Sequence, residues 1–252
     1  MSLSAVIITK NEERNIERCL NSLIGVADEI VVVDSMSTDA TADICRRYGC
    51  RITSRPFTGY GSQRQYAAGL ARTPYVLSID ADEVLSDELR ESIIKLKEQG
   101  FDHRMYSFRV VSYVCGHTVG HSGMAPTVET RLFDRRFASW NLNDVGERLT
   151  YPRGVQPQLI AGDMYHHRCD DFGELDFKEI RNARLRGRLM AAAGINASLP
   201  FCWLRAASAF VGCHLRDGAM LDGETGRRIA KTRFKATLEA YLTARNIHKG
   251  KE

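Results

Sequence analysis

The amino-acid sequence predicts an α/β fold with a mostly parallel central sheet. Three short apolar runs have the composition of strands buried on both faces, namely Leu3 to Thr9, Glu29 to Asp34 and Tyr75 to Asp80. Between them, apolar residues recur with helical spacing over residues 16–23 and, less regularly, over residues 42–48. Strands that alternate with helices along a chain form parallel sheets with helices on both faces. We therefore expect a three-layer sandwich.

The second part of the chain has a different pattern. From Arg104, longer β-type segments extend over Met105 to Val114 and Glu129 to Phe133. The stretch between them, Cys115 to Pro126, contains Gly and His and predicts a long loop, a feature that is often functional in a compact domain. From about Phe172 the pattern is helical, and a last basic helix begins at about residue 226.

Composition indicates one catalytic-sized domain with an appendage. The chain has 252 residues, of which 44% are hydrophobic and 26% charged, and this balance excludes a disordered or collagen-like chain. The net charge of +4 is too small for a dedicated nucleic-acid binder. Residues 1–171 hold 20 Lys+Arg and 23 Asp+Glu, whereas residues 172–252 hold 15 and 8. We assign residues 1–171 to a catalytic domain and residues 172–252 to a basic helical appendage.

The sequence also predicts the cell compartment. Seven cysteines, an odd number without C-x-x-C spacing, indicate neither a disulfide framework nor a zinc site and favour a reducing cytosol. The chain enters a strand-like run at Leu3 without the basic region and apolar segment of a signal peptide. The segment Leu199 to Leu215 has about the minimum length of a membrane span, but Arg205 near its middle argues against spanning. It remains suited to a membrane surface.

Polar residues follow the predicted parallel strands, at the edge where α/β sheets bind ligands. The sharpest pattern is Asp80-Ala81-Asp82, in which two carboxylates just past a buried strand project to the same side. Such a pair suits Mg²⁺ or Mn²⁺ bound together with the phosphate oxygens of a substrate. The alternative is that Asp80 and Asp82 only cap the helix that begins near Ser86 and Asp87.

Asp34 ends another predicted strand and is a second candidate ligand. The chain has neither a G-x-G-x-x-G motif nor a P-loop, so a nucleotide would be held by carboxylates and a metal. The Asp34 carboxylate can accept hydrogen bonds from a base or a ribose. The alternative is a turn and N-cap for the helix from about Thr41, a role that Asp39 alone can fill.

Several segments carry a resemblance to a known family. They are Leu3–Glu13, Ala27–Asp39, Gly59–Gln65 and Leu77–Glu83. In order and spacing they resemble the successive motifs of family 2 glycosyltransferases. Arg131–Arg136, Asp144–Arg148 and Leu221–Gly226 resemble more narrowly the bacterial lipopolysaccharide inner-core β-1,4-glucosyltransferase group. The similarity spans nearly the full chain, is strongest over residues 3–83 and is loosest from about residue 150 to 215.

The resemblance implies a GT-A type three-layer α/β sandwich with a mostly parallel central sheet and a C-terminal helical appendage. It also implies a nucleotide-sugar donor, a divalent metal (Mg²⁺ or Mn²⁺) and inversion at the anomeric carbon. The nucleotide-sugar site falls within residues 3–83 and the acceptor and base region within residues 104–150. Carried over to this sequence, the resemblance places Thr9 and Glu12 beside the nucleoside, Asp34 at the uracil, Arg64 near the nucleotide, Asp80 at the ribose and Asp82 on the metal.

Glu147 matches the family's position for the catalytic base. Inverting transfer needs a base because the acceptor hydroxyl loses its proton as it attacks the anomeric carbon opposite the departing diphosphate. The alternative is a surface Glu in a loop. The group usually has His before this Glu, whereas this chain has Gly146, which has no side chain to act as ligand or hydrogen-bond partner. Either another group compensates, such as His117, His121 or His166, or the acceptor geometry differs.

Arginines are the remaining candidates. Arg131, Arg135 and Arg136 can clamp diphosphate oxygens or an acceptor phosphate, and we assign Arg131 to the nucleotide-sugar site. For Arg135 and Arg136 a solvated sheet edge is an equal alternative. The basic residues of 172–252 are interleaved with apolar ones, which suits either an anionic membrane surface or ordinary solvated helix faces. No nucleic-acid motif is present, so nucleic acid is not an expected partner.

The sequence thus predicts an inverting, metal-dependent hexosyltransferase. The expected donor is a UDP-sugar, UDP-glucose above all, and the expected acceptor is a heptose or other sugar of a lipopolysaccharide core or a lipid-linked sugar. The expected location is the cytoplasm, peripheral to the inner membrane. The alternatives are a glycosyltransferase of another bacterial surface glycan, a nucleotidyltransferase and a non-catalytic binding scaffold.

Overall fold

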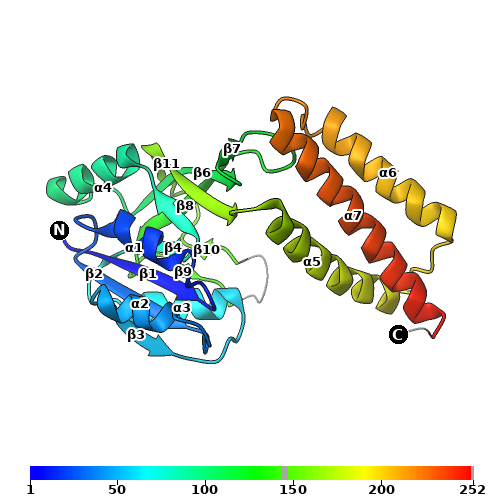
Figure 1. Cartoon of the computed structure of the whole chain (residues 1–252). Coiled ribbons are helices and arrows are strands. Elements are labelled where there is room, and N and C mark those ends of the chain that lie inside the picture. The colour runs from blue at the N-terminus through cyan, green and yellow to red at the C-terminus, as the bar shows by residue number, and fades with distance from the viewer. Residues whose placement is uncertain (143–146, 251–252) are drawn as a thin grey trace. The chain divides into compact units, whose positions relative to one another are not determined.

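The computed structural model describes residues 1–142 and 147–250, and in it the chain forms two units (Figure 1). The first unit comprises Met1–Val110 and Thr127–His166, and the second comprises Val111–Pro126 and His167–Glu252. Residues 111–126, which we assigned to the catalytic domain, therefore belong with the C-terminal helices. The division into a catalytic domain 1–171 and an appendage 172–252 stays a prediction.

A mixed sheet forms the centre of the first unit, with the strand order β3-β2-β1-β4-β8-β6-β11-β5. The strands of the chain are β1 Leu3–Thr9, β2 Glu29–Asp34, β3 Arg51–Ser54, β4 Tyr75–Asp80, β5 Glu83–Leu85, β6 Met105–Val114, β7 His117–Val119, β8 Thr127–Asp134, β9 Ser139–Trp140, β10 Leu149–Thr150 and β11 Gln158–Cys169. Strand β1 is parallel to β2 and β4, and β2 is parallel to β3. Beyond β4, β8 is antiparallel to β4 and β6, and β5 is antiparallel to β11.

Helices cover both faces of the parallel strands. They are α1 Ile16–Leu23, α2 Thr41–Arg47 and α4 Asp87–Gln99 on one face and α3 Tyr60–Leu70 on the other. Successive side chains of a strand point to opposite faces, so Ala5 and Ile7 join one hydrophobic core while Val6 joins the other. The predicted α/β fold, a three-layer sandwich with a mostly parallel central sheet, is confirmed.

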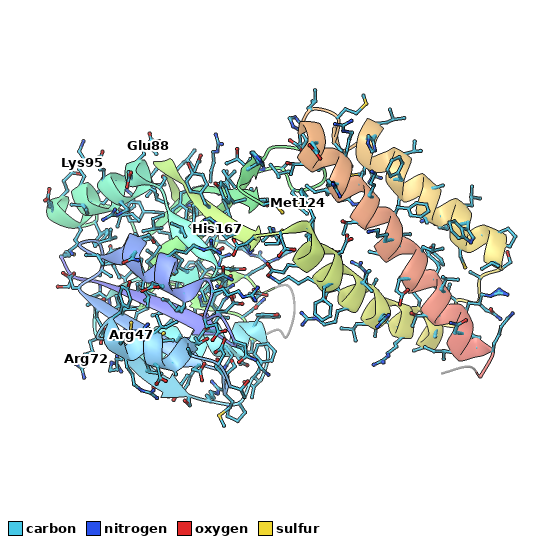
Figure 2. All side chains as sticks on the ribbon, in the orientation of Figure 1. Arg47, Arg72, Glu88, Lys95, Met124 and His167 are labelled. Atoms are coloured by element: carbon cyan, nitrogen blue, oxygen red, sulfur yellow. The ribbon has the colours of Figure 1, made fainter. Side chains whose placement is uncertain are left out.

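Charged side chains of the first unit lie on its outside. Figure 2 shows Arg47, Arg72, Glu88 and Lys95 pointing away from the two cores, and all four side chains are exposed. These residues belong to the outer faces of helices or to turns, and they supply matched controls for substitutions in the site.

Several strands that position the site were not predicted from the sequence. Strand β11 pairs with β5 so that His166 lies opposite Glu83. The short strands β9 and β10 pair so that Trp140 lies opposite Leu149. Neither pairing has a clear alternating pattern in the sequence, because these strands are short or are only partly buried.

The second unit contains the helices α5 Phe172–Ala192, α6 Leu199–Leu215 and α7 Gly223–His248. Figure 1 shows α7 lying between α5 and α6. The predicted helical C-terminal segment is confirmed, and its last helix begins three residues earlier than expected. Within the described part of the chain, no helix has the length and apolar content needed to cross a membrane.

Small residues let α5 and α7 approach closely. Ala183 of α5 packs with Ala236 and Ala240 of α7 in a core of their own. A Cβ added to Gly187 would lie 2.6 Å from the carbonyl oxygen of Ala240 and 2.6 Å from the Cβ of Thr243. No side chain fits at that distance, so this crossing requires glycine.

The predicted loop 115–126 is partly ordered by secondary structure, because β7 within it forms a hairpin with β6. Asp222 holds the turn that follows. Its carboxylate accepts hydrogen bonds from the N–H groups of Gly120 and His121, both at 3.1 Å, and from the hydroxyl of Ser122 at 2.5 Å. The motif Leu221–Gly226 thus has a structural function in this unit.

Candidate functional site

Three parallel strands end side by side and bring the predicted nucleotide-site residues together. The strand register pairs Thr9 with Asp34 across β1 and β2, and Ile8 with Asp80 across β1 and β4. Thr9 and Asp34 are both buried. The Thr9 hydroxyl has no hydrogen-bond partner among the described residues. The edge of the sheet that the sequence predicted as a ligand site is therefore assembled by strand pairing.

Asp34 makes local hydrogen bonds. Its carboxylate accepts the N–H of Ser37 at 3.0 Å and also the hydroxyl of Ser37. Asp39 satisfies the first backbone N–H of α2, because its carboxylate accepts the N–H of Thr41 at 3.0 Å. Asp34 therefore forms the turn considered as its alternative role, and its contact with a base or ribose stays a prediction.

Glu12 orders the loop between β1 and α1. Its N–H donates to the Thr41 hydroxyl at 2.8 Å, and its carboxylate accepts the side-chain amide of Asn15 at 2.7 Å. Its carbonyl accepts the N–H groups of Asn15 and Ile16 at 2.9 Å. Glu12 thus ties this loop to α1 and α2, and its place beside the nucleoside stays a prediction.

Arg64 is at the centre of the site. It is a buried residue of α3, a helix that is anchored to the strand ends because Gln63 Nε2 donates to Ser35 Oγ at 3.0 Å. Its Nη2 atom lies 2.6 Å from Oδ2 of Asp80, and its Nε atom lies 3.3 Å from Oε1 of Glu147. Asp80 and Glu147, which are 67 positions apart in the sequence, therefore contact the same guanidinium.

Arg131 of β8 is the second buried arginine of the site, and like Arg64 it contacts several carboxylates. Its Nη2 atom lies 2.7 Å from Glu129 and 3.4 Å from Glu83, and its Nη1 atom lies 4.0 Å from Asp80. Burial by itself would raise the pKa of Asp80, but the positive charges of Arg64 and Arg131 lower it below its ordinary value. Burial opposes the charge of Arg131 too, yet Glu83 and Asp80 raise its pKa above the ordinary value.

Glu83 belongs to the site although the sequence analysis assigned it no role. It is fully buried, and its carboxylate accepts the N–H of Asp80 at 2.7 Å, which fixes the turn between β4 and β5. Burial raises the pKa of Glu83 to about 7 against the opposing charge of Arg131. Its position directly after Asp82 indicated that Glu83 lies near the strand-end site. Only the folded chain shows that Glu83 is buried beside Arg131.

Asp82 and His166 form the part of the site that can hold a metal. The Oδ2 atom of Asp82 lies 3.1 Å from Nε2 of His166, and both side chains are partly exposed. Among the described residues, no group of three or more His, Cys, Asp or Glu side chains is arranged to hold a metal ion by itself. One carboxylate and one imidazole suit a cation that completes its shell with phosphate oxygens and water.

Of the three histidines considered as substitutes for the missing one, His166 is in the first unit and lies 3.1 Å from Asp82. His117 and His121 belong to the second unit, where the ring of His121 lies 3.2 Å from Asp222. Gly146 lies outside the described residues. The sequence order gave no indication of which histidine approaches Asp82, because the contact depends on the pairing of β11 with β5.

Arg135 and Arg136 lie away from the site. Strand β8 is antiparallel to β4, and its last residue, Asp134, pairs with Tyr75, the first residue of β4. Arg135 Nε donates to the carbonyl of Thr73 at 2.9 Å, and Arg136 lies 2.8 Å from Asp134. Both arginines therefore lie at the opposite end of the sheet, which agrees with the sheet-edge alternative and not with a phosphate clamp at the strand ends.

A cleft of about 550 Å³ adjoins Glu147. It is lined by Val128, Glu129, Thr130, Arg131, Trp140, Glu147, Arg148, Leu149 and Tyr151. The Trp140 ring lies 5.2 Å from the guanidinium carbon of Arg64, and its indole N–H has no hydrogen-bond partner among the residues described. Aromatic surfaces beside a few charged groups are typical of a small-molecule site. This cleft is the open space next to the predicted base.

Comparison with known proteins places the chain in the class of glycosyltransferases. Within that class the chain belongs to glycosyl transferase family 2, whose model matches residues 4–151. The matched segment contains all the predicted site residues and leaves out His166, which comes from β11.

Two curated relatives differ in how much of the chain they match. The chain is 28% identical to the lipopolysaccharide core biosynthesis glycosyltransferase LpsC of Rhizobium meliloti, over 98% of this chain and 92% of that protein. It is 36% identical over 140 residues to an uncharacterized glycosyltransferase of Rickettsia bellii, covering 55% of this chain. The chain spans about half the length of the rickettsial relatives that it matches.

Solved structures also match. The match to TarS 1–349 of S. aureus covers the whole of this chain and 92% of the TarS chain, with 13% identity and a TM-score of 0.46. A second match is to glucosyl-3-phosphoglycerate synthase from Mycobacterium tuberculosis in complex with Mn²⁺, UDP-glucose and phosphoglyceric acid. It covers 45% of this chain and 43% of the synthase chain, with 25% identity and a TM-score of 0.33.

Proposed function

We propose that the protein is an inverting, metal-dependent glycosyltransferase that moves glucose from UDP-glucose to a heptose or other sugar of a lipopolysaccharide core. The observation that carries this proposal is the position of Glu147. Its carboxylate pairs with Arg64, and the same guanidinium pairs with Asp80 at the strand-end site. The similarity to a lipopolysaccharide core glycosyltransferase over nearly the whole chain supports the acceptor class. The site of action is the cytoplasmic face of the inner membrane.

The donor binds at the carboxyl ends of the parallel strands. Thr9, Glu12 and Asp34 border the nucleoside, and Asp80 accepts a hydrogen bond from the ribose. Arg64 and Arg131 hold Asp80 ionised, because they lower the pKa of its carboxyl group. An ionised carboxylate is the stronger hydrogen-bond acceptor for a hydroxyl.

Asp82 and His166 are the residues that would hold Mg²⁺ or Mn²⁺ on the diphosphate. When bound, the cation would stabilise the negative charge of the leaving diphosphate. Asp82 lies beside His166, whereas Asp80 pairs with Arg64, so of these two Asp82 is the carboxylate with the donor set for a metal.

Glu147 acts as the general base. Its carboxylate accepts the proton of the acceptor hydroxyl, whose oxygen forms the new bond to the anomeric carbon while the bond from that carbon to the diphosphate oxygen breaks. Attack opposite the leaving group inverts the configuration. Arg64 positions Glu147 by pairing with Oε1, and the acceptor sugar occupies the cleft lined by Trp140, Arg148 and Tyr151.

A thermal-shift series with nucleotide sugars, with and without Mn²⁺, tests the proposal, followed by a transfer assay on a lipopolysaccharide core acceptor. UDP-glucose is expected to raise the melting temperature only with the metal, since a ligand that binds the folded state stabilises it by mass action. Stabilisation by another donor would exclude glucose. Pyrophosphate release from a nucleoside triphosphate would indicate a nucleotidyltransferase, and a protein that neither transfers nor hydrolyses UDP-glucose would be a binding scaffold.

A further inference from the structure

Helix α6 has a solvent-facing side that carries several large apolar side chains. Its buried side carries Cys202, Ala206 and Cys213. At 3.6 residues per turn, Leu204, Val211 and Leu215 lie about half a turn away from that buried side. Leu204 is 64% exposed and Leu215 is 74% exposed. The two sides of this helix are therefore both apolar, although only one of them has a partner within the second unit.

The turn after α6 continues this apolar surface. Met220 and Leu221 are among the most exposed large apolar side chains described, with Leu221 at 75%. Trp203 lies at the border between the buried and exposed sides, where its ring packs 5.9 Å from that of Phe234 of α7 while half of the side chain remains exposed. An indole held at the edge of an apolar surface is the arrangement found where proteins meet the headgroup region of a bilayer.

Basic residues flank the apolar surface. Arg227 and Lys231 of α7 are exposed and lie seven and three residues before Phe234, so they share its side of α7, beside Trp203 of α6. Arg205 lies on α6 itself and is exposed as well. The surface thus combines apolar groups with cations.

The nearby acidic groups do not cancel this charge. Asp222 is 6% exposed and accepts hydrogen bonds from the loop 120–122. Asp217 is mostly buried and pairs with Arg216 and Arg233. Glu224 is exposed and lies 3.9 Å from Arg228. Two of the three acids between residues 199 and 238 are therefore turned inward, and α6 itself contains neither Asp nor Glu.

We infer that this face, formed by Leu204, Val211, Leu215, Leu221 and Trp203 with Arg227 and Lys231, docks on the surface of a bilayer that contains anionic lipids. The apolar side chains enter the boundary between headgroups and acyl chains, and the basic side chains lie among the phosphates. A second copy of the chain is the poorer occupant, because it would bring the same cations against this face. The inference does not rest on the proposed function, since binding to lipid requires no turnover.

Sedimentation of the full chain with vesicles tests the inference. One set of vesicles is phosphatidylcholine alone, and the other contains 30% phosphatidylglycerol. Binding to the anionic vesicles is expected to be at least tenfold stronger and to weaken in 0.5 M salt, because salt screens the basic residues. Equal binding to both kinds of vesicle, or no binding to either, would overturn the inference.

Variants locate the surface. Leu204→Ser, Leu215→Ser and Leu221→Ser combined are expected to lower vesicle binding at least tenfold, and Arg227→Gln with Lys231→Gln at least fivefold. The matched control is Ile24→Ser, at an apolar side chain that is 58% exposed in the first unit, and it should bind as the unaltered chain does. All of these side chains are exposed, so the melting temperatures should stay unchanged. Loss of a dimer in light scattering, with vesicle binding unaffected, would assign the face to a second copy instead.

Discussion

The Nε atom of Arg64 lies 3.3 Å from Oε1 of Glu147, while Nη2 of the same guanidinium lies 2.6 Å from Oδ2 of Asp80. The planar fork of arginine can pair with two carboxylates at once, and the single ammonium of lysine cannot do so in the same geometry. This contact joins the strand-end site, where the donor is proposed to bind, to the proposed base. It also makes Arg64 the residue whose substitution tests both.

Replacing Arg64 by Lys is expected to lower kcat/KM by about 100-fold, because a base displaced by an ångström loses its alignment with the acceptor. The same substitution made on top of Glu147→Gln should cost much less, since its main effect acts through Glu147. Arg47→Lys, on the exposed side of α2, is the control and should leave kinetics unchanged (Figure 2). Additive losses in the double variant would show that Arg64 acts independently of the base.

Glu147→Gln should lower turnover by about 10²–10⁴-fold, because the amide has the shape of the carboxylate and cannot accept the proton. Donor binding, measured by calorimetry with UDP-glucose and Mn²⁺, should change by less than about twofold. Glu88→Gln on α4 removes an exposed carboxylate and serves as the control. A parallel loss of donor binding and turnover would point to a structural role for Glu147.

Asp82→Asn and His166→Ala should each weaken Mn²⁺-dependent donor binding by about 10–100-fold, since a metal bound by few protein ligands depends on each of them. The measurement is the melting temperature with UDP-glucose as Mn²⁺ is titrated. Asp87→Asn, at the exposed start of α4, should behave as the unaltered protein. Near-normal turnover of Asp82→Asn in the presence of a chelator would refute the metal site.

Gly187→Ala is expected to destabilise the second unit by about 1–3 kcal/mol, because the added methyl group would meet the Ala240 carbonyl at 2.6 Å. Gly212→Ala is the matched control in α6, where a Cβ meets nothing within 4 Å. There alanine should be neutral or stabilising by up to about 1 kcal/mol, because glycine is a poor helix former. Denaturant unfolding of both variants gives the comparison, and equal effects would contradict the close packing of α5 and α7.

Asp134 predicts an acid-dependent loss of stability. Hydrogen bonds from Arg136, together with one from Arg104, lower the pKa of this buried carboxyl to about 2. A pKa lower in the folded than in the unfolded chain contributes stability above about pH 4, which is lost as the pH falls through 2. The contribution is at most about 2 kcal/mol, because both arginines are exposed. Asp134→Asn should flatten the dependence of unfolding free energy on pH in this range, and an unchanged slope would exclude the contribution.

Much of the fold follows from local sequence patterns. The strands β1, β2 and β4 are continuous apolar runs and were predicted close to their observed bounds, because strands buried on both faces need apolar residues throughout. Helix α5 was expected from about Phe172, where it begins. In contrast, β11 and β5 were not predicted, because partly buried or three-residue strands leave no clear period in the sequence.

Some residues of the candidate site were likewise predictable from local sequence patterns, and others were not. Thr9, Asp34, Asp80 and Asp82 were found from the sequence because each ends or follows a predicted strand, and parallel strands end together. His166 and Glu83 took their place only through the antiparallel register of β11 and β5. For Arg135 and Arg136 the sequence left a clamp and a sheet edge equally open, and the direction of β8 places them at the other end of the sheet.

The sequence by itself determined the α/β class, the family and the carboxylates at the strand ends, because these depend on residues close together in the chain. The tertiary structure alone decided which basic side chain meets which carboxylate: Arg64 with Asp80 and Glu147, Arg131 with Glu83, and His166 with Asp82. These pairs join residues from distant segments. Their contacts depend on strand order and register, which only the packed chain defines.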